Sequence, residues 1–234
     1  MLGGNPSLEH IMKTRYVIII SVVAGLIGVS VILCGGFWLL RRSAGPKSNQ
    51  PTQTTGQPHQ REAAKAAAKE GFAFKRSGQN AQAIAAFESA IREDPDYTES
   101  YHGLAQVQRE AGDPSTAIIH HDRAIQLDPG RFDLYWERGV TYLRLKNYDA
   151  AITNFEACLE RNSQFGNAHL GLGEAYRSKS DFPTALLHHD KAIALKPDSD
   201  WFYRERGNTY QKMGDQQLAD ADFAKARELQ QNTR

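Results

Sequence analysis

A repeat of 34 residues constrains this chain more than any other feature of its sequence. The phrase Ala-Ile-x-x-x-Pro ends at Pro95, Pro129 and Pro197, so these prolines are separated by 34 residues or by twice that number. A fixed period in this range predicts stacked copies of one small unit in place of a single globular core. Five copies fit the chain, at residues 64–97, 98–131, 132–165, 166–199 and 200–233.

Several positions of the repeat, numbered 1 to 34, hold restricted residue types. Position 8 is always Gly or Ala and position 20 is always Ala, which lets two helices approach closely. Position 24 alternates between Phe and His: Phe87, His121, Phe155, His189 and Phe223. This pattern resembles the tetratricopeptide repeat family. The resemblance implies an all-α, right-handed solenoid of five helix-turn-helix repeats over residues 61–234.

A longer period of two repeats is superimposed on the first. Repeats two and four share His-His-Asp-x-Ala-Ile, from His120 and from His188. Repeats three and five share Tyr-x-Glu-Arg-Gly-x-Thr-Tyr, from Tyr135 and from Tyr203. We interpret this as the duplication of a two-repeat unit.

Residues 16–40 contain no charged side chain. At ~1.5 Å per residue a helix of this length spans roughly 37 Å, enough to cross a hydrocarbon core of ~30 Å. The sequence therefore predicts a polar tail at 1–15, a single transmembrane helix at 16–40 that places the chain in a lipid bilayer, and a flexible linker at 41–60. The linker is rich in Ser, Pro, Gln, Thr and Gly, a composition typical of disordered segments.

Two alternatives compete with the membrane anchor. A cleaved signal peptide has a shorter apolar region and a small-residue cleavage site, whereas here Pro46 follows the candidate site. A lipoprotein would use Cys34, but the bulky Leu33 precedes it. The length of the apolar run favours an uncleaved anchor. Arg41, Arg42 and Lys47 after the span slightly favour a cytoplasmic repeat domain.

The composition and the motifs exclude several classes of function. A net charge of +1 does not indicate a general nucleic-acid binder. The sequence has no phosphate loop, nucleophile elbow or zinc-spaced cysteine set, so we expect no enzyme activity and no cofactor. The adjacent histidines at 120–121 and 188–189 lack the i, i+4 spacing of helical metal ligands, and His121 and His189 should pack in the Phe position of the core.

The resemblance also implies where partners bind. In this family the first helix of each repeat lines a concave groove, and positions 2, 5, 9, 12 and 13 commonly face it. Position 12 or 13 is basic in every repeat, and two tryptophans occupy positions 5 and 2. The implied groove residues are Lys75, Arg76, Arg109, Trp136, Arg144, Arg177, Trp201 and Lys212. Alternatively, the cations stand there only because they interact favourably with helix C-termini.

These features predict a membrane-tethered scaffold or assembly factor that binds partner proteins or acidic peptide segments through the groove. A receptor for a targeting peptide at a protein-translocation machine is the main alternative, and a non-catalytic enzyme subunit is a third. The chaperone-binding members of this family use Lys, Asn and Arg at defined groove positions. This chain has Ala68, Phe72, Asp133 and Glu137 there, so that clamp is absent.

Overall fold

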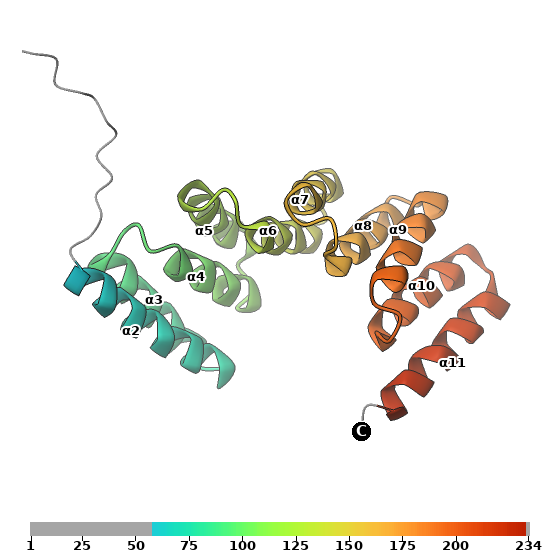
Figure 1. Cartoon of the computed structure of the whole chain (residues 1–234), viewed down its shortest axis with the longest axis horizontal. Helices are drawn as coiled ribbons and strands as arrows, with labels where there is room; N and C mark the ends of the chain where they lie inside the picture. Colours follow the sequence, from blue (N-terminus) through green and yellow to red (C-terminus); the bar gives the residue numbers. More distant parts are fainter. Residues whose placement is uncertain (1–57, 233–234) are drawn as a thin grey trace, which may run out of the picture. The chain divides into compact units, whose positions relative to one another are not determined.

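The structure is a computed structural model that describes residues 58–232. Within these residues the structure contains ten helices joined by short turns and has no strand (Figure 1). The tail, the predicted transmembrane helix and most of the predicted linker lie outside the described residues. Within residues 58–232, no helix combines the length and the apolar character needed to cross a bilayer. The helices are α2 (Pro58–Arg76), α3 (Asn80–Glu93), α4 (Thr98–Glu110), α5 (Pro114–Leu127), α6 (Phe132–Arg144), α7 (Tyr148–Arg161), α8 (Gly166–Ser178), α9 (Phe182–Leu195), α10 (Asp200–Met213) and α11 (Gln216–Asn232).

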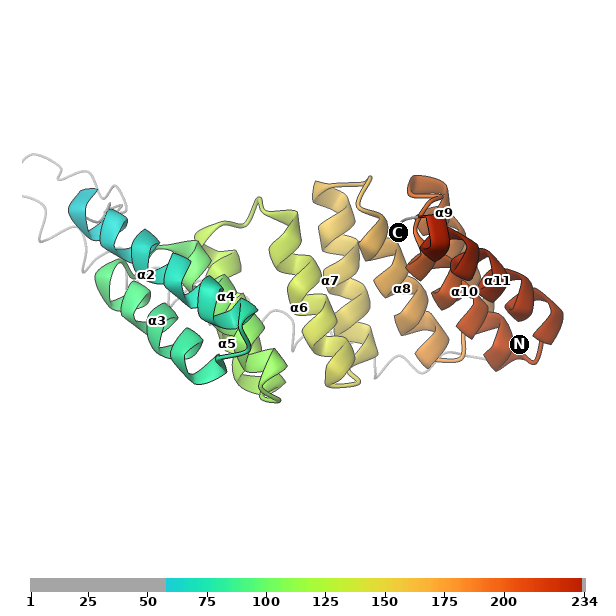
Figure 2. The ribbon, with the colours of Figure 1, turned by 90° about the horizontal axis from the view of Figure 1, so that it is seen from below.

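Consecutive helices pair into five hairpins, which follow one another in chain order (Figures 1 and 2). The first helices of neighbouring repeats also touch: α2 contacts α4, α4 contacts α6, α6 contacts α8, and α8 contacts α10. The second helices of neighbouring repeats make no such contacts in the described residues. The even-numbered helices therefore form a closely spaced inner layer, and the odd-numbered helices are spread over the outer side. This confirms the predicted all-helical solenoid of hairpins.

The first helix begins earlier than the sequence indicated. α2 starts at Pro58, inside the segment 41–60 that was expected to be a linker. Proline is favoured in the first turn of a helix, where its missing N–H has no intrahelical partner. Arg61 holds this turn in place, because its Nη1 donates to Oδ2 of the buried Asp94 at 2.7 Å.

Each hairpin turns at position 15 of its repeat through a residue with positive φ. Three of the five residues are glycines, which adopt this conformation without steric cost. The other two are Lys146, with φ of 57°, and Ser180, with φ of 64°. In three repeats the next residue caps the second helix, because its side chain accepts a hydrogen bond from a backbone N–H of the first turn. These bonds join Asp113 to Thr116, Asn147 to Ala150 and Asp181 to Thr184.

Two kinds of interface alternate along the stack. Between repeats one and two, the buried ring of Phe87 packs against Gly71 and Gly103, where an added Cβ would lie 2.8 Å and 2.3 Å from the ring. Phe155 packs in the same way between Gly139 and Gly171. These interfaces tolerate only glycine at the two contact points.

The other two interfaces are polar and belong to the duplicated unit. Nε2 of the buried His121 lies 3.1 Å from Oγ1 of Thr141, and Nε2 of His189 lies 3.0 Å from Oγ1 of Thr209. Thr141 donates its hydroxyl proton to the carbonyl of Glu137, so the histidine must donate to Thr141. The identical bonds, 68 residues apart, support the duplication read from the sequence.

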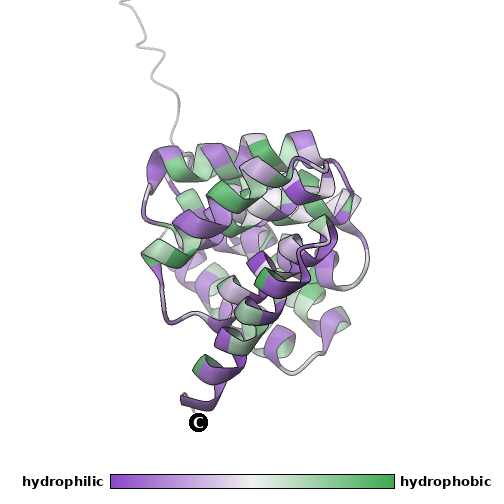
Figure 3. Ribbon diagram, turned by 90° about the vertical axis from the view of Figure 1, so that its right-hand side faces the viewer, coloured by the Kyte–Doolittle hydropathy of each residue, from purple (hydrophilic) through white to green (hydrophobic). Residues whose placement is uncertain are grey.

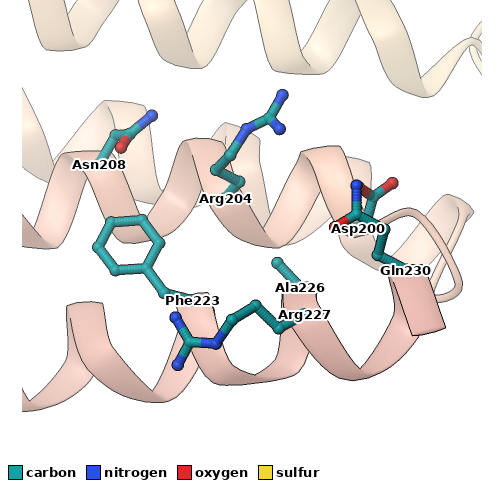
Figure 4. A pocket seen from close by; sticks show the side chains of 7 residues that line it. All are labelled: Asp200, Arg204, Asn208, Phe223, Ala226, Arg227 and Gln230. Atoms are coloured by element: carbon teal, nitrogen blue, oxygen red, sulfur yellow. The ribbon is translucent and has the colours of Figure 1, made fainter.

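The last hairpin differs from the others on its outer helix. Positions 21 and 28 hold Ile or Leu in the first four repeats but Asp220 and Arg227 in the fifth. Phe223 is half-buried, whereas its counterparts in the other repeats are fully buried. Figure 4 shows Phe223 and Arg227 on α11 beside a pocket of about 240 Å³, with Arg204 and Asn208 on the neighbouring α10. The polar substitutions suit a face in contact with water.

The helices carry both hydrophobic and hydrophilic residues (Figure 3). The apolar sides meet between helices, and the largest buried cluster lies around Phe155 and Leu134 in repeat three. Cys158 belongs to this cluster, and burial raises the pKa of its thiol to about 12. The thiol is therefore protonated at neutral pH and serves as a small packing group.

Candidate functional site

The inner helices present the candidate groove. Because they run parallel to one another, equivalent repeat positions form rows across the stack. The eight residues implied by the sequence lie on these helices, but they differ in burial and in partners. Three of the six basic residues are already paired with carboxylates of the same chain.

Arg109 is a structural residue. Its Nη1 forms an ion pair with Oε2 of Glu137 on the next inner helix and also donates to the Glu137 carbonyl at 3.3 Å. Only 10% of the Arg109 side chain and 9% of the Glu137 side chain are exposed. The charge of Arg109 is thus engaged within the chain, and its role in partner binding stays a prediction.

Arg177 repeats this arrangement one duplicated unit later. Its Nη1 lies 3.0 Å from both Oε2 and the backbone carbonyl of Glu205. Lys75 is also engaged, since its Nζ is 2.6 Å from Oε1 of Gln106 and 3.2 Å from Oε1 of Glu110. The continuous basic row expected from the sequence is therefore interrupted at three places.

The other three cations keep their charge available. Arg76, Arg144 and Lys212 are exposed and form no ion pair within the described residues. Arg144 donates only to the backbone carbonyl of Arg109, at 3.0 Å. These three occupy position 13 of repeats one, three and five, at the C-terminal ends of their helices.

An apolar ridge occupies the middle of the inner layer. The ridge consists of three half-buried side chains at positions i, i+4 and i+7 of α6, which are Trp136, Val140 and Leu143. The Trp136 ring meets Phe165 edge to face at 5.7 Å, and Phe132 meets Phe165 at 5.0 Å. We call Trp136, Val140 and Leu143 the α6 ridge. Trp201, in repeat five, is 39% exposed and lies beside Phe202.

A polar network that the sequence did not indicate links α4 to α6. Arg131 binds Asp133 through two nitrogens, at 2.9 Å and 2.7 Å, and also pairs with Glu99. Gln106 donates to Oε1 of Glu137 at 2.7 Å. The sequence did contain a signal for the contacts of Glu137. Position 6 is Glu in repeats three and five, and position 12 is Arg in the repeat that precedes each of them.

The histidines of the polar interfaces are not arranged for metal binding. Their Nδ1 atoms are buried without a hydrogen-bond partner, and burial lowers the pKa of His121 well below its usual value and that of His189 to about 3. Both rings are therefore neutral, with the proton on Nε2. Within residues 58–232, no group of three or more His, Cys, Asp or Glu side chains could hold a metal ion.

An all-α solenoid with an exposed inner layer is the architecture of helical repeat proteins, which present extended concave surfaces to partners. Residues 68–132, 132–165 and 203–233 match the tetratricopeptide repeat, and residues 173–214 match the TPR repeat. Residues 68–233 of this chain therefore belong to the tetratricopeptide repeat family. Members of this family generally mediate protein–protein interactions.

Curated relatives match only part of their own length. Superkiller protein 3 of Schizosaccharomyces pombe is 26% identical over an alignment of 178 residues that covers 58% of this chain and 13% of that protein. Hsc70-interacting protein 1 of Drosophila melanogaster is 36% identical over 84 residues, which are 36% of this chain and 22% of that protein. An N-acetylglucosaminyltransferase of Giardia intestinalis shares 66 residues at 32% identity, only 4% of that enzyme.

Solved structures share the fold. MamA of Desulfovibrio magneticus superposes with a TM-score of 0.64 at 22% identity, over 73% of this chain and 97% of that one. YrrB, described as a TPR protein with an unusual peptide-binding site, superposes with a TM-score of 0.56 at 18% identity, over 72% and 87% of the two chains. At these identities the likeness concerns the fold alone.

Proposed function

We propose that this chain is a membrane-tethered scaffold or assembly factor that binds segments of partner proteins on its inner helices. The observation that carries the proposal is the α6 ridge. Three apolar side chains at helical spacing remain half-buried in the middle of the inner layer. Partly exposed tryptophan next to apolar neighbours is typical of residues that dominate binding energy at interfaces.

Charge has a secondary role in this binding. Arg144 ends the same helix as the α6 ridge, and Arg76 and Lys212 occupy the same position two repeats away on either side. A partner segment with apolar side chains over the ridge and acidic side chains toward these cations would match the surface. Partners are thus proteins or peptide segments, and the proposal involves no nucleic acid, cofactor or catalysis.

The tether is the second part of the proposal. The uncharged run at 16–40 would anchor the repeats to a bilayer, with the repeat domain on the cytoplasmic side. Full-length protein should remain in the membrane pellet after washing with alkaline carbonate. Release into the supernatant would disprove the anchor without affecting the proposed binding surface.

The similarity to Hsc70-interacting proteins raises chaperones as partners. Position 5 and position 9 of repeat one hold Ala68 and Phe72, which cannot bind a carboxylate. Glu137, at a position where a cation would be required, is committed to Arg109. We therefore do not propose a chaperone C-terminus as the ligand.

Copurification from detergent-solubilised membranes tests the binding surface. Partners retained by the full-length chain should be lost from Trp136→Ala and Arg144→Glu, each weakening binding by roughly 1–3 kcal/mol if the residue is a hot spot. Lys225→Glu, on the outer helix α11, is the matched charge-reversal control. Binding that survives both inner-layer substitutions would reject the proposal. A partner that binds only as an isolated peptide would favour the targeting-receptor alternative.

A further inference from the structure

Three residues that differ from their counterparts in the neighbouring repeats line one pocket. Gly166 occupies position 1, Phe202 position 3 and Lys196 position 31. The equivalent residues of the neighbouring repeats are Thr98, Phe132 and Asp200 at position 1, Ser100, Leu134 and Ala168 at position 3, and Asp94, Asp128 and Asn162 at position 31. The pocket has a volume of about 310 Å³ and lies where α8 begins, α9 ends and α10 begins.

The glycine and the phenylalanine give the pocket its shape. A Cβ on Gly166 would lie 3.1 Å from Cε2 of Phe202, so the missing side chain lets the Phe202 ring approach the start of α8. Phe165, Leu195 and Phe202 supply the apolar lining. A volume of about 310 Å³ is at the lower end for ligand pockets, so the pocket suits one bulky side chain.

The lysine gives the pocket its charge. In two earlier repeats the position 31 side chain folds back on its own turn: Asp94 Oδ1 accepts from the Asp96 N–H at 3.0 Å, and Asn162 Oδ1 accepts from the Gln164 N–H at 3.2 Å. Lys196 cannot accept such a bond, and it forms no ion pair within residues 58–232.

The remaining polar lining is neutral. Gln164 and Asn167 contribute amides, so the residues that line the pocket carry one positive charge and no negative charge. A cation also suits the C-terminus of α9, where Lys196 caps the helix. That explanation does not account for the glycine and the large ring that face the same space.

We propose that this pocket binds a partner segment in which a large apolar side chain is adjacent to an acidic residue. The apolar side chain packs against the partly exposed Phe165 and Leu195, with the buried Phe202 ring beneath them, and the carboxylate pairs with Lys196. The pocket lies at the ends of three helices, beside the inner layer, and its Phe165 wall also packs against Trp136 of the α6 ridge. A single segment could engage both surfaces, because Asn167 in the pocket wall occupies position 2, on the side of the groove.

Selection from a phage-displayed library of random 12-residue peptides on the detergent-solubilised full-length chain tests the proposal. The wild-type protein should enrich peptides with a large apolar residue next to Asp or Glu. A synthetic peptide with this motif should bind about fivefold more weakly to Lys196→Glu, the size expected for an exposed ion pair. Gly166→Leu fills the pocket and should weaken binding more than tenfold, as loss of an anchor site does.

Two controls make the outcome decisive. Lys191→Glu reverses an exposed charge on the same helix outside the pocket and should select the same motif as the wild type. Arg144→Glu changes the proposed groove outside the pocket and should also select this motif, so failure of the groove proposal and failure of the pocket proposal can be told apart. The inference is overturned if no apolar–acidic motif is enriched, or if the motif peptide binds Lys196→Glu as tightly as the wild type. Lys196→Glu, an exposed substitution, keeps the test valid if Gly166→Leu does not fold.

Discussion

Replacing Glu137 with Leu should lower the free energy of unfolding by about 3–5 kcal/mol, because it leaves a buried guanidinium without its anion. The side chains of Arg109 and Glu137 are only 10% and 9% exposed, so water cannot replace the lost carboxylate. Gln106 loses an acceptor at 2.7 Å in the same substitution. The loss is therefore much greater than for an ion pair on the surface.

The double variant Arg109→Met/Glu137→Leu distinguishes the free-energy cost of an unpaired buried charge from the cost of changed side-chain packing. Removing both charges avoids the unpaired guanidinium, so its stability should lie much closer to that of the wild type. Glu228→Gln breaks the exposed pair with Lys225, whose side chains are 58% and 40% exposed, and should cost no more than about 1 kcal/mol.

Urea unfolding of the full-length chain, followed by far-UV circular dichroism, measures all three variants. If Glu137→Leu costs no more than Glu228→Gln, Arg109 is not held by Glu137 in solution. The residue would then return to the set of cations available for binding. The expected result instead removes Arg109 from that set and leaves Arg76, Arg144 and Lys212.

Two further predictions concern the alternating interfaces. The folded-state pKa of His189, about 3, lies below the ordinary value near 6.5, so stability is complete above pH 6.5 and falls as the pH drops toward 3. The free energy of unfolding should therefore be about 2 kcal/mol lower at pH 5 than at pH 7.5 because of this histidine alone. His189→Phe should reduce the difference in unfolding free energy between these two pH values. An unchanged difference would contradict the burial of a neutral ring. Gly103→Ala should lower the melting temperature although alanine is the better helix former by about 1 kcal/mol, because its Cβ would lie 2.3 Å from the Phe87 ring; a rise would show that the ring can move aside.

The sequence predicted the helices well because the same pattern of residues recurs in all five repeats. Small residues at positions 8 and 20 and an aromatic or histidine at position 24 fix which faces meet, and a single repeat period locates every hairpin. The sequence placed the start of α2 too late, because the long-range ion pair between Arg61 and Asp94 adds to the local preference of Pro58 for a first helical turn. No local propensity encodes that contact.

The candidate site was predicted only in part. Trp136 and Arg144 lie on the inner helix α6, as their repeat positions predicted, and their role in partner binding stays a prediction. The pairing of Arg109 and Arg177 was missed, because a basic residue looks the same in sequence whether or not the next helix supplies a carboxylate. The pocket beside Gly166 was also missed, since it arises from three packing departures that are far apart in the chain.

The duplication explains how charge is distributed over the inner layer. Each two-repeat unit contributes one polar interface, in which a position 12 arginine binds a position 6 glutamate and a position 24 histidine binds a position 10 threonine. The charges of Arg109, Glu137, Arg177 and Glu205 are therefore paired with one another between neighbouring repeats. The α6 ridge stays half-buried, and Arg76, Arg144 and Lys212 stay exposed at the C-terminal ends of their helices. Contact area should accordingly contribute more than charge to partner affinity, and raising the salt concentration should weaken binding only moderately, by screening Arg76, Arg144 and Lys212.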